Sequence, residues 1–236
     1  MNIAIIIPTY NERENIENIV SQIFSLLPNA MIVVVDDNSP DNTALRVKEL
    51  QKRNKKLHLI MRKNKGGRGS AVIDGFFYAR QNLKPEIYIE MDADLSHDPS
   101  ELPLLIKKSK VKTIILASRY ISGSKIIDVP VYRRLMSKAS NFFISFLLGM
   151  SVADNTNGYR CYRRDAIDIL LKYTFISKGY ILLSESAFLL YTRGFLLVEI
   201  PSVFRNRRFG VSNATFFEFF HALTSVLRIR TSVLSI

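Results

Sequence analysis

Two aspartates, Asp92 and Asp94, stand one residue apart at the end of an apolar run, in the segment YIEMDADLSHDP. Carboxylates beside a buried strand are costly, because desolvation penalises their charged form. A divalent cation or a cationic partner is the usual compensation. Mg²⁺ is commonly held by one or two carboxylates together with the phosphate oxygens of a substrate. Taken alone such a pair is a weak signal, because similar triplets occur by chance on protein surfaces, but it suggests a Mg²⁺ or Mn²⁺ site that receives a diphosphate.

Further acidic and polar residues follow two other apolar runs. Asp36, Asp37 and Asp41 lie in VVVDDNSPDNT, and Tyr10 and Glu12 lie in PTYNE. Acidic groups at neighbouring strand ends would repel a phosphate unless a cation intervened, which favours a metal site. The segment DNSPDNT is also rich in turn-forming residues. Asp41 therefore has a second interpretation, as a turn or capping residue.

Five short apolar runs are the strands expected to position these residues: 3–7, 31–35, 57–61, 87–91 and 113–117. Segments with helical spacing of apolar residues separate them. This alternation predicts an α/β fold with a Rossmann-like, mainly parallel sheet flanked by helices, which binds ligands at the carboxyl ends of its strands. Beyond residue 120 we expect a loop in SGSKIIDVP, helices at about 134–149 and 214–230, and a loop in VADNTNGYRCYRRDA.

The composition is typical of a globular protein. The 236 residues are 47% hydrophobic and 23% charged, and we find neither repeats nor a clear linker, so we expect a single domain over 1–236. No apolar stretch reaches the roughly 20 residues of a spanning helix. The single cysteine, Cys161, allows no internal disulfide and fits a reducing compartment.

The net positive charge of the protein comes entirely from the second part of the chain. Residues 1–100 contain 13 Lys and Arg against 13 Asp and Glu, whereas residues 101–236 contain 20 against 8. This excess indicates an anionic partner, such as a nucleic acid, an anionic membrane or a phosphorylated substrate, or else a solvated basic surface. A nucleic-acid-binding module would have no use for acidic strand ends, so we expect no nucleic-acid partner. Oligonucleotide binding that Asp92→Asn left unchanged would favour that alternative.

Four segments of the first part, IIIPTYNE, VVVDDNSPDNT, MDADLSHDP and SRY, together resemble family 2 glycosyltransferases with the GT-A fold. Four more, YRRLMS, DNTNGYRCYRRDA, SKGYILLSESA and VEIPSVFRNRRFGVSN, are similar to the dolichyl-phosphate (polyprenyl-phosphate) mannosyltransferase branch. The motifs occur in the same order and cover nearly the whole chain. The resemblance implies a nucleotide-sugar-binding part at 1–120 and an acceptor-binding part at 121–236.

The resemblance also implies a reaction. A hexose, in this branch mannose from GDP-mannose, would pass with inversion to the phosphate of dolichyl or another polyprenyl phosphate, giving a lipid-linked sugar donor for glycosylation. The divalent cation would be Mg²⁺ or Mn²⁺. A UDP-glucose-dependent enzyme with the same kind of acceptor is the alternative. A family 2 enzyme with a glycan acceptor would need a carboxylate base where this chain offers arginines.

By position in the motifs, the resemblance implies ten residues that bind the nucleotide sugar: Pro8, Tyr10, Glu12, Val35, Asp37, Asp92, Ala93, Asp94, Arg119 and Arg207. Asp92, Asp94 and Arg119 are the catalytic positions among them. Arg133 and Ser137 match residues that take the acceptor phosphate.

Asp92, Asp94 and Ser96 match the metal-binding positions of the family, which usually has a glutamine where this chain has Ser96. Serine can still bind a metal or hold a water. Asn213 is a second departure, because the family has a lysine there near the donor phosphates. Arg205 or Arg208 could compensate for that lysine.

Physical reasoning supports these roles for the arginines. A lipid phosphate is already an anion near neutral pH, so the reaction needs no general base. It needs arginines that bring two anions together, and guanidinium groups bind phosphate in a bidentate manner. For Arg160, Arg163 and Arg164, by contrast, we expect a solvated helix face.

Contact with a lipid acceptor would come from the two apolar helices. Five residues of the last helix share one face: Phe216, Phe219, Phe220, Leu223 and Leu227. Amphipathic aromatic helices flanked by arginines can lie in a bilayer surface. We therefore expect a peripheral protein at the cytoplasmic face of a membrane, and a helix buried in the core or in a dimer is the alternative.

Overall fold

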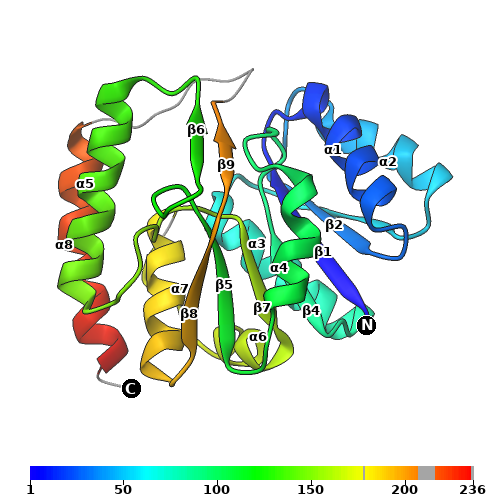
Figure 1. Cartoon of the computed structure of the whole chain (residues 1–236). Helices are drawn as coiled ribbons and strands as arrows, with labels where there is room; N and C mark the ends of the chain where they lie inside the picture. The colour runs from blue at the N-terminus through cyan, green and yellow to red at the C-terminus, as the bar shows by residue number, and fades with distance from the viewer. Residues whose placement is uncertain (178, 207–215, 235–236) are drawn as a thin grey trace.

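The computed structural model of the chain describes residues 1–177, 179–206 and 216–234, and for 216–224 the backbone alone. A seven-stranded sheet, in the order β3-β2-β1-β4-β7-β5-β8, runs through the molecule (Figure 1). Its strands are β1 Ile3–Thr9, β2 Met31–Asp36, β3 Leu57–Met61, β4 Ile87–Glu90, β5 Thr113–Ser118, β7 Arg160–Arg163 and β8 Leu196–Pro201. Every pair of neighbours is parallel except those that include β7, which is antiparallel to β4 and β5. The predicted mainly parallel sheet is confirmed.

Helices cover both faces of this sheet. They are α1 Arg13–Leu26, α2 Thr43–Arg53, α3 Arg68–Tyr78, α4 Leu102–Lys108, α5 Val131–Leu148, α6 Arg164–Leu170, α7 Ile181–Thr192 and α8 Phe216–Leu234. In β1, Ile5 and Ile7 face α1, α2 and α4, whereas Ala4 and Ile6 face α3 and the helices α5 to α8. Both faces of the strand are buried, which explains the uninterrupted apolar run in its sequence.

Two strands fall where a loop is expected from the sequence. The segment SGSKIIDVP contains β6, Lys125–Ile127, which pairs in parallel with β9, Val203–Arg205. The segment around Cys161 contains β7, whose arginines conceal it from a hydrophobicity pattern. Polar residues can enter a buried strand only when their hydrogen bonds are satisfied inside the protein.

Arg160 satisfies that condition, and its predicted solvated position is wrong. The side chain is fully buried. Its guanidinium donates to the backbone carbonyls of Asn157 at 2.9 Å, Leu183 at 2.6 Å and Asn155 at 2.6 Å. The arginine thereby fixes the loop that precedes β7.

The last two long helices, α5 and α8, lie side by side at one edge of the molecule (Figure 1). Val226, Ile229 and Val233 of α8 pack into the core, while Leu227 is exposed. The other four residues of the predicted apolar face, at 216, 219, 220 and 223, have side chains outside the described part. In the described part of the chain, no helix combines the length and apolar character that crossing a bilayer requires.

Candidate functional site

Asp92 and Asp94 lie in a tight turn directly after β4, at the carboxyl end of the central strands. The Asp92 side chain is 18% exposed, whereas Asp94 and Ser96 are buried. The backbone N–H of Ser96 donates to Oδ1 of Asp94 at 3.0 Å, and Leu95 adopts a left-handed φ of 61°. The turn therefore brings the three predicted metal-binding residues together at one end of the sheet.

Arg68, the first residue of α3, forms ion pairs with the carboxylates of Asp92 and of Glu90, the last residue of β4. Its Nε donates to Oδ1 of Asp92 at 2.7 Å, and its Nη1 donates to Oε2 of Glu90 at 2.9 Å. Burial would lower the pKa of this guanidinium, but the two carboxylates outweigh that effect and raise the pKa above its ordinary value. The sequence analysis missed this residue, because nothing in its local sequence indicates partners 22 and 24 residues away.

His97 holds the backbone of the same turn. Its Nδ1 accepts a hydrogen bond from the Asp92 N–H at 3.0 Å, and its Nε2 lies 2.8 Å from Oδ1 of Asn157. The ring stacks on Tyr159, with centroids 5.0 Å apart. Because Nδ1 is an acceptor, Nε2 carries the proton that Asn157 receives. The imidazole thereby joins the turn to the loop before β7.

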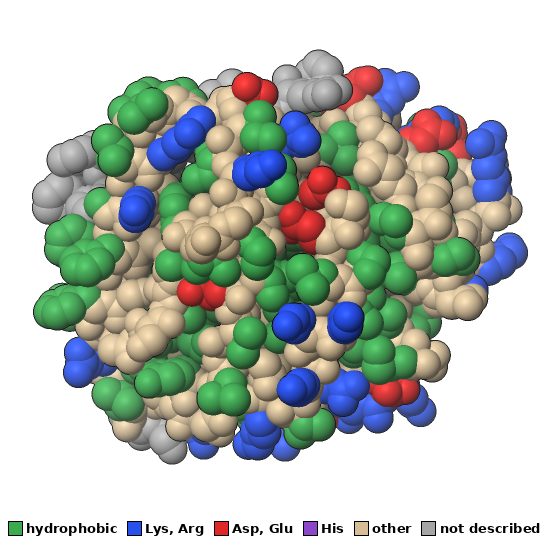
Figure 2. Space-filling view, in the orientation of Figure 1, with side chains coloured by type: hydrophobic (Ala, Val, Ile, Leu, Met, Phe, Trp, Pro, Cys, Tyr) green, Lys and Arg blue, Asp and Glu red, His purple; other side chains and the backbone are tan. Residues whose placement is uncertain are grey.

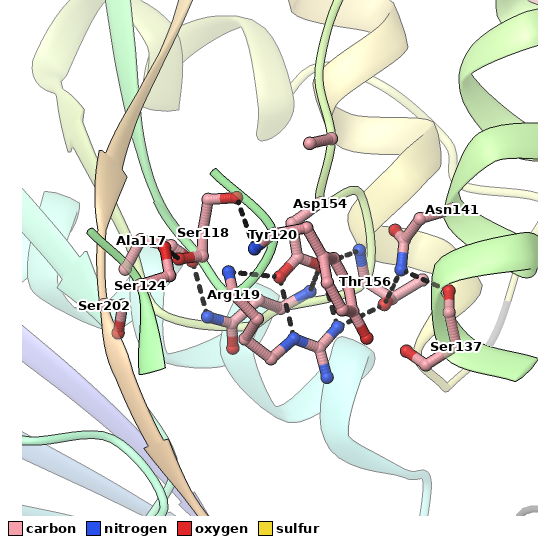
Figure 3. A network of polar contacts seen from close by, with 12 residues as sticks. Ala117, Ser118, Arg119, Tyr120, Ser124, Ser137, Asn141, Asp154, Thr156 and Ser202 are labelled. Atoms are coloured by element: carbon pink, nitrogen blue, oxygen red, sulfur yellow. Dashed lines mark hydrogen bonds and ion pairs between the residues drawn. The ribbon is translucent and has the colours of Figure 1, made fainter. Parts of the chain in front are cut away.

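Arg119 is the centre of a second polar network, drawn in Figure 3, after the end of β5. Its Nε and Nη2 donate to the two carboxylate oxygens of Asp154 at 2.7 and 2.8 Å, and Nη2 also donates to Oγ1 of Thr156 at 2.8 Å. Burial would raise the pKa of Asp154, but Arg119 outweighs it and lowers that pKa. Among the described residues, Nη1 of Arg119 makes no hydrogen bond. One edge of the guanidinium is therefore fixed by Asp154 and Thr156, which leaves Nη1 as its remaining donor nitrogen.

Ser137 of α5 belongs to the same network (Figure 3). Asn141 donates both to the carbonyl of Ser137 at 2.9 Å and to Oγ1 of Thr156 at 3.1 Å. Burial raises the pKa of the Tyr120 hydroxyl, while Arg119 and a hydrogen bond with Ser137 act in the opposite direction. The structure thus connects a residue predicted for the acceptor, Ser137, with one predicted for the donor, Arg119, through Tyr120, Asn141 and Thr156.

Arg133 lies one helical turn before Ser137 on α5. It is half-buried, and among the described residues it forms no ion pair. Arginine at this place contributes a charge that no described carboxylate neutralises, which suits a phosphate-binding position.

The residues predicted for the nucleoside gather at the ends of β1 and β2. Pro8 and Val35 are partners in the parallel register of these strands. Tyr10 is exposed, and Nζ of Lys65 lies 3.6 Å from the centroid of its ring. Oε2 of Glu12 accepts a hydrogen bond from the side chain of Asn15, in the first turn of α1, at 2.8 Å.

Asp37 is buried beneath the glycine-rich loop that precedes α3. Nη1 of Arg62 donates to it at 2.9 Å, and the backbone N–H groups of Gly66 and Gly67 donate to it at 3.0 and 2.7 Å. The carboxylate therefore holds the backbone of the glycine-rich loop in place beside the proposed nucleoside position. The sequence motif around Asp37 does not indicate this role.

Other predicted positions differ in their outcome. Asp41 accepts hydrogen bonds from the N–H and hydroxyl of Thr43 at 2.9 and 2.6 Å, and from the N–H of Arg13 at 3.0 Å, so the turn interpretation of Asp41 is confirmed. Asp36 accepts hydrogen bonds from two hydroxyls, those of Thr9 and Ser39. Arg207, Arg208 and Asn213 lie outside the described residues.

The donor set at the turn suits a cation that substrate oxygens help to hold. Within the described ranges, no three His, Cys, Asp or Glu side chains are grouped as a complete metal site. Mg²⁺ in nucleotide sites usually takes one or two carboxylates and completes its shell with phosphates and water. Asp92 and Asp94 provide that number of carboxylates.

Comparison with known proteins decides the family. The family model "Glycosyl transferase family 2" matches residues 4–171. The chain belongs to this family. This glycosyl transferase family 2 protein is 37% identical to the polyprenol monophosphomannose synthase of Mycolicibacterium smegmatis, over 88% of this chain and 79% of the relative. It is 32% identical to the undecaprenyl-phosphate mannosyltransferase of Micrococcus luteus, over 90% of this chain and 87% of the relative.

A solved structure confirms the fold of this family 2 protein. The mannosyltransferase of Pyrobaculum calidifontis, in complex with GDP-Man and Mn²⁺, aligns with a TM-score of 0.60 at 17% identity, over 99% of this chain and 74% of that chain. The two relatives above confirm the expected polyprenyl-phosphate mannosyltransferase branch.

Proposed function

We propose that this glycosyltransferase moves mannose from GDP-mannose to the phosphate of a polyprenyl phosphate, with inversion at the anomeric carbon. The observation that carries the proposal is the polar network that joins Arg119 to Ser137 through Thr156 and Asn141, because it connects the predicted donor and acceptor positions. The relatives' names support mannose and a polyprenyl phosphate, and the Pyrobaculum structure, a complex with GDP-Man, supports the nucleotide.

The donor would bind along the carboxyl ends of β1, β2 and β4. Pro8, Tyr10, Val35 and Asp37 would receive the nucleoside, and Asp92 and Asp94 would hold Mg²⁺ or Mn²⁺ beside the diphosphate. A cation bound there supplies stabilisation of the negative charge on the leaving nucleoside diphosphate. The Ser96 hydroxyl, on the same turn, would serve as a ligand or hold a water.

The acceptor phosphate would bind between α5 and the Arg119 network. Arg133 and Ser137 hold its oxygens, and Nη1 of Arg119 faces the charge shared by the two substrates. A phosphate oxygen then attacks the anomeric carbon while the bond to the diphosphate breaks on the opposite face. No proton has to be removed from the nucleophile, so the reaction needs no general base.

The exposed side of α5 suits contact with the membrane that carries such an acceptor. Seven apolar residues of α5 are exposed at a helical spacing: Val131, Tyr132, Leu135, Met136, Phe142, Phe143 and Phe146. Phe142 and Phe146 are 66% and 72% exposed, and their rings stack with centroids 6.4 Å apart. Figure 2 shows hydrophobic and basic side chains together at the edge where α5 lies in Figure 1. Such a surface favours an anionic bilayer.

A panel of donors tests the proposed function. Purified protein is incubated with a short polyprenyl phosphate, Mn²⁺ or Mg²⁺, and GDP-mannose, UDP-glucose or GDP-glucose in turn. We expect transfer to the lipid with GDP-mannose and a β-linked mannosyl phosphate as product. Preferred use of UDP-glucose would show that the proposed donor is wrong but the reaction class is right. If no sugar is transferred to any polyprenyl phosphate, the proposed acceptor is wrong.

A further inference from the structure

Arg68 is a buried cation placed directly on the carboxylate that is proposed to hold a divalent cation. Its side chain is 11% exposed and those of Glu90 and Asp92 are 2% and 18% exposed. The guanidinium forms ion pairs with both carboxylates, at 2.9 Å to Glu90 and 2.7 Å to Asp92. A second positive charge that approaches Asp92 would therefore meet Arg68 at short range.

The position of this guanidinium is tightly determined by its surroundings. Its Nη2 donates to the carbonyl of Gly158 at 2.9 Å, and a Cβ added to Gly158 would lie only 1.9 Å from the same nitrogen. Glu90 is held from its other side by the hydroxyl of Tyr162 at 2.6 Å. A side chain so confined keeps its charge beside Asp92 rather than swinging into solvent.

We infer that Arg68 makes cation binding at Asp92 conditional on the nucleotide. Without nucleotide, the guanidinium neutralises much of the charge of Asp92 and repels a dication. A nucleoside diphosphate adds negative charge and oxygen ligands, which offset that repulsion. The cation and the nucleotide sugar then bind with strong positive coupling, and Arg68 is the positioning residue responsible.

This inference rests on the proposed metal site, and the chain provides variants that separate the two. Arg68→Met removes the guanidinium, and Arg68→Lys keeps a positive charge. Since loss of one partner of a buried ion pair can destabilise the fold, Arg68→Met combined with Glu90→Gln serves as a second variant. Arg80→Met is the matched control, because it removes an arginine from the exposed pair with Asp168, away from the turn.

The test measures Mn²⁺ binding directly, by electron paramagnetic resonance of the free ion, with and without GDP. We expect Arg68→Met and the double variant to bind Mn²⁺ about tenfold more tightly than the wild type without GDP, with a smaller change when GDP is present. Arg68→Lys and Arg80→Met should bind Mn²⁺ as the wild type does.

Three outcomes would overturn the inference. In the first, both Arg68→Met variants bind Mn²⁺ without GDP no more tightly than the wild type, while the wild type still binds Mn²⁺ when GDP is present. This result contradicts the inference but leaves the proposed metal site intact. So does an affinity of Arg80→Met that shifts as much as that of Arg68→Met. A wild type whose Mn²⁺ binding with GDP is the same as that of Asp92→Asn contradicts the proposed metal site and, with it, the inference.

Discussion

The Nε2 of His97 lies 2.8 Å from Oδ1 of Asn157, and this hydrogen bond joins the turn of Asp92 to the loop that fixes Arg119. On one side, Nδ1 of His97 receives the N–H of Asp92. On the other side, the backbone N–H of Asn157 donates to Oδ1 of Asp154 at 3.2 Å. The side-chain Nδ2 of Asn157 donates to the backbone carbonyl of Ala117 at 2.5 Å. A buried imidazole, together with Arg68, which bonds both Asp92 and the carbonyl of Gly158, therefore holds the proposed metal-binding turn against the loop that fixes Arg119.

His97→Ala should disrupt that connection. We expect the free energy of unfolding to fall by about 2–4 kcal/mol, because the substitution leaves a cavity and an unpaired buried N–H at Asp92. Turnover should fall at least about tenfold, since small displacements of catalytic groups are costly. Urea unfolding and steady-state assays measure both. His58→Ala, which removes a half-buried ring next to Tyr78, should cost less than about 1 kcal/mol; equal losses in both variants would show that His97 has no special role.

Asp154→Asn should remove the anchor of Arg119 and change how stability depends on pH. Folding lowers the pKa of this carboxyl below its ordinary value of 3.8, so the ion pair contributes fully above that pH and is lost as the pH falls through the lower, folded-state pKa. We expect the variant to lose about 3 kcal/mol near neutral pH, because Arg119 is left buried without its partner. The gap to the wild type should narrow as the pH is lowered below 3.8 and the folded-state carboxylate becomes protonated. A gap that stays constant in urea titrations over this range would contradict the assignment.

Phe142→Ser together with Phe146→Ser should weaken membrane attachment. Burial of apolar surface contributes about 25 cal/mol per Å², so two exposed phenylalanines can supply a few kcal/mol of binding. We expect sedimentation with anionic liposomes to fall strongly, while turnover of a detergent-soluble acceptor is retained. Leu45→Ser with Phe77→Ser is the control, because it removes exposed apolar groups from α2 and α3. If the control loses as much binding, or the α5 variant loses none, another surface attaches the protein.

Arg133→Ala should impair use of the acceptor much more than binding of the nucleotide sugar. Arg133 lies one helical turn before Ser137 on α5 and forms no ion pair within the described ranges. We expect KM for the polyprenyl phosphate to rise about tenfold or more, with little change in the Kd of GDP-mannose. Lys138→Ala, on the exposed side of the same helix, is the control. Equal losses for both substrates would assign Arg133 to the donor site or to the fold.

The sequence predicts the secondary structure correctly where a strand or helix has its own pattern of apolar residues. Strands β1 to β5 have short, mainly apolar runs, and Asp92 and Asp94 are recognisable from their place after the run of β4. Strand β7 has no such signal, because the charge of its Arg160 is satisfied by two carbonyls of the preceding loop and one of α7, which come together only in the folded protein.

The supporting residues of the site are hidden for the same physical reason. Arg68 meets Glu90 and Asp92 only because α3 begins beside the end of β4, and Asp154 meets Arg119 across 35 residues of sequence. Such pairs depend on topology, not on spacing along the chain. The resemblance to a family identifies residues proposed to touch substrates, whereas the residues that hold them in place require the structure.

The most direct test of the proposed chemistry is mannosyl transfer by Asp92→Asn and Asp94→Asn. Transfer from GDP-mannose to a short polyprenyl phosphate is measured with saturating Mn²⁺, beside Asp98→Asn, which makes the same chemical change at a turn residue that binds the N–H of Ser100. We expect each of the first two variants to lose at least about 100-fold in turnover while remaining folded, because charge on the leaving diphosphate is no longer stabilised. Asp98→Asn should stay within about threefold of the wild type. Near-normal turnover by Asp92→Asn or Asp94→Asn, with the metal still required, would contradict the proposed site.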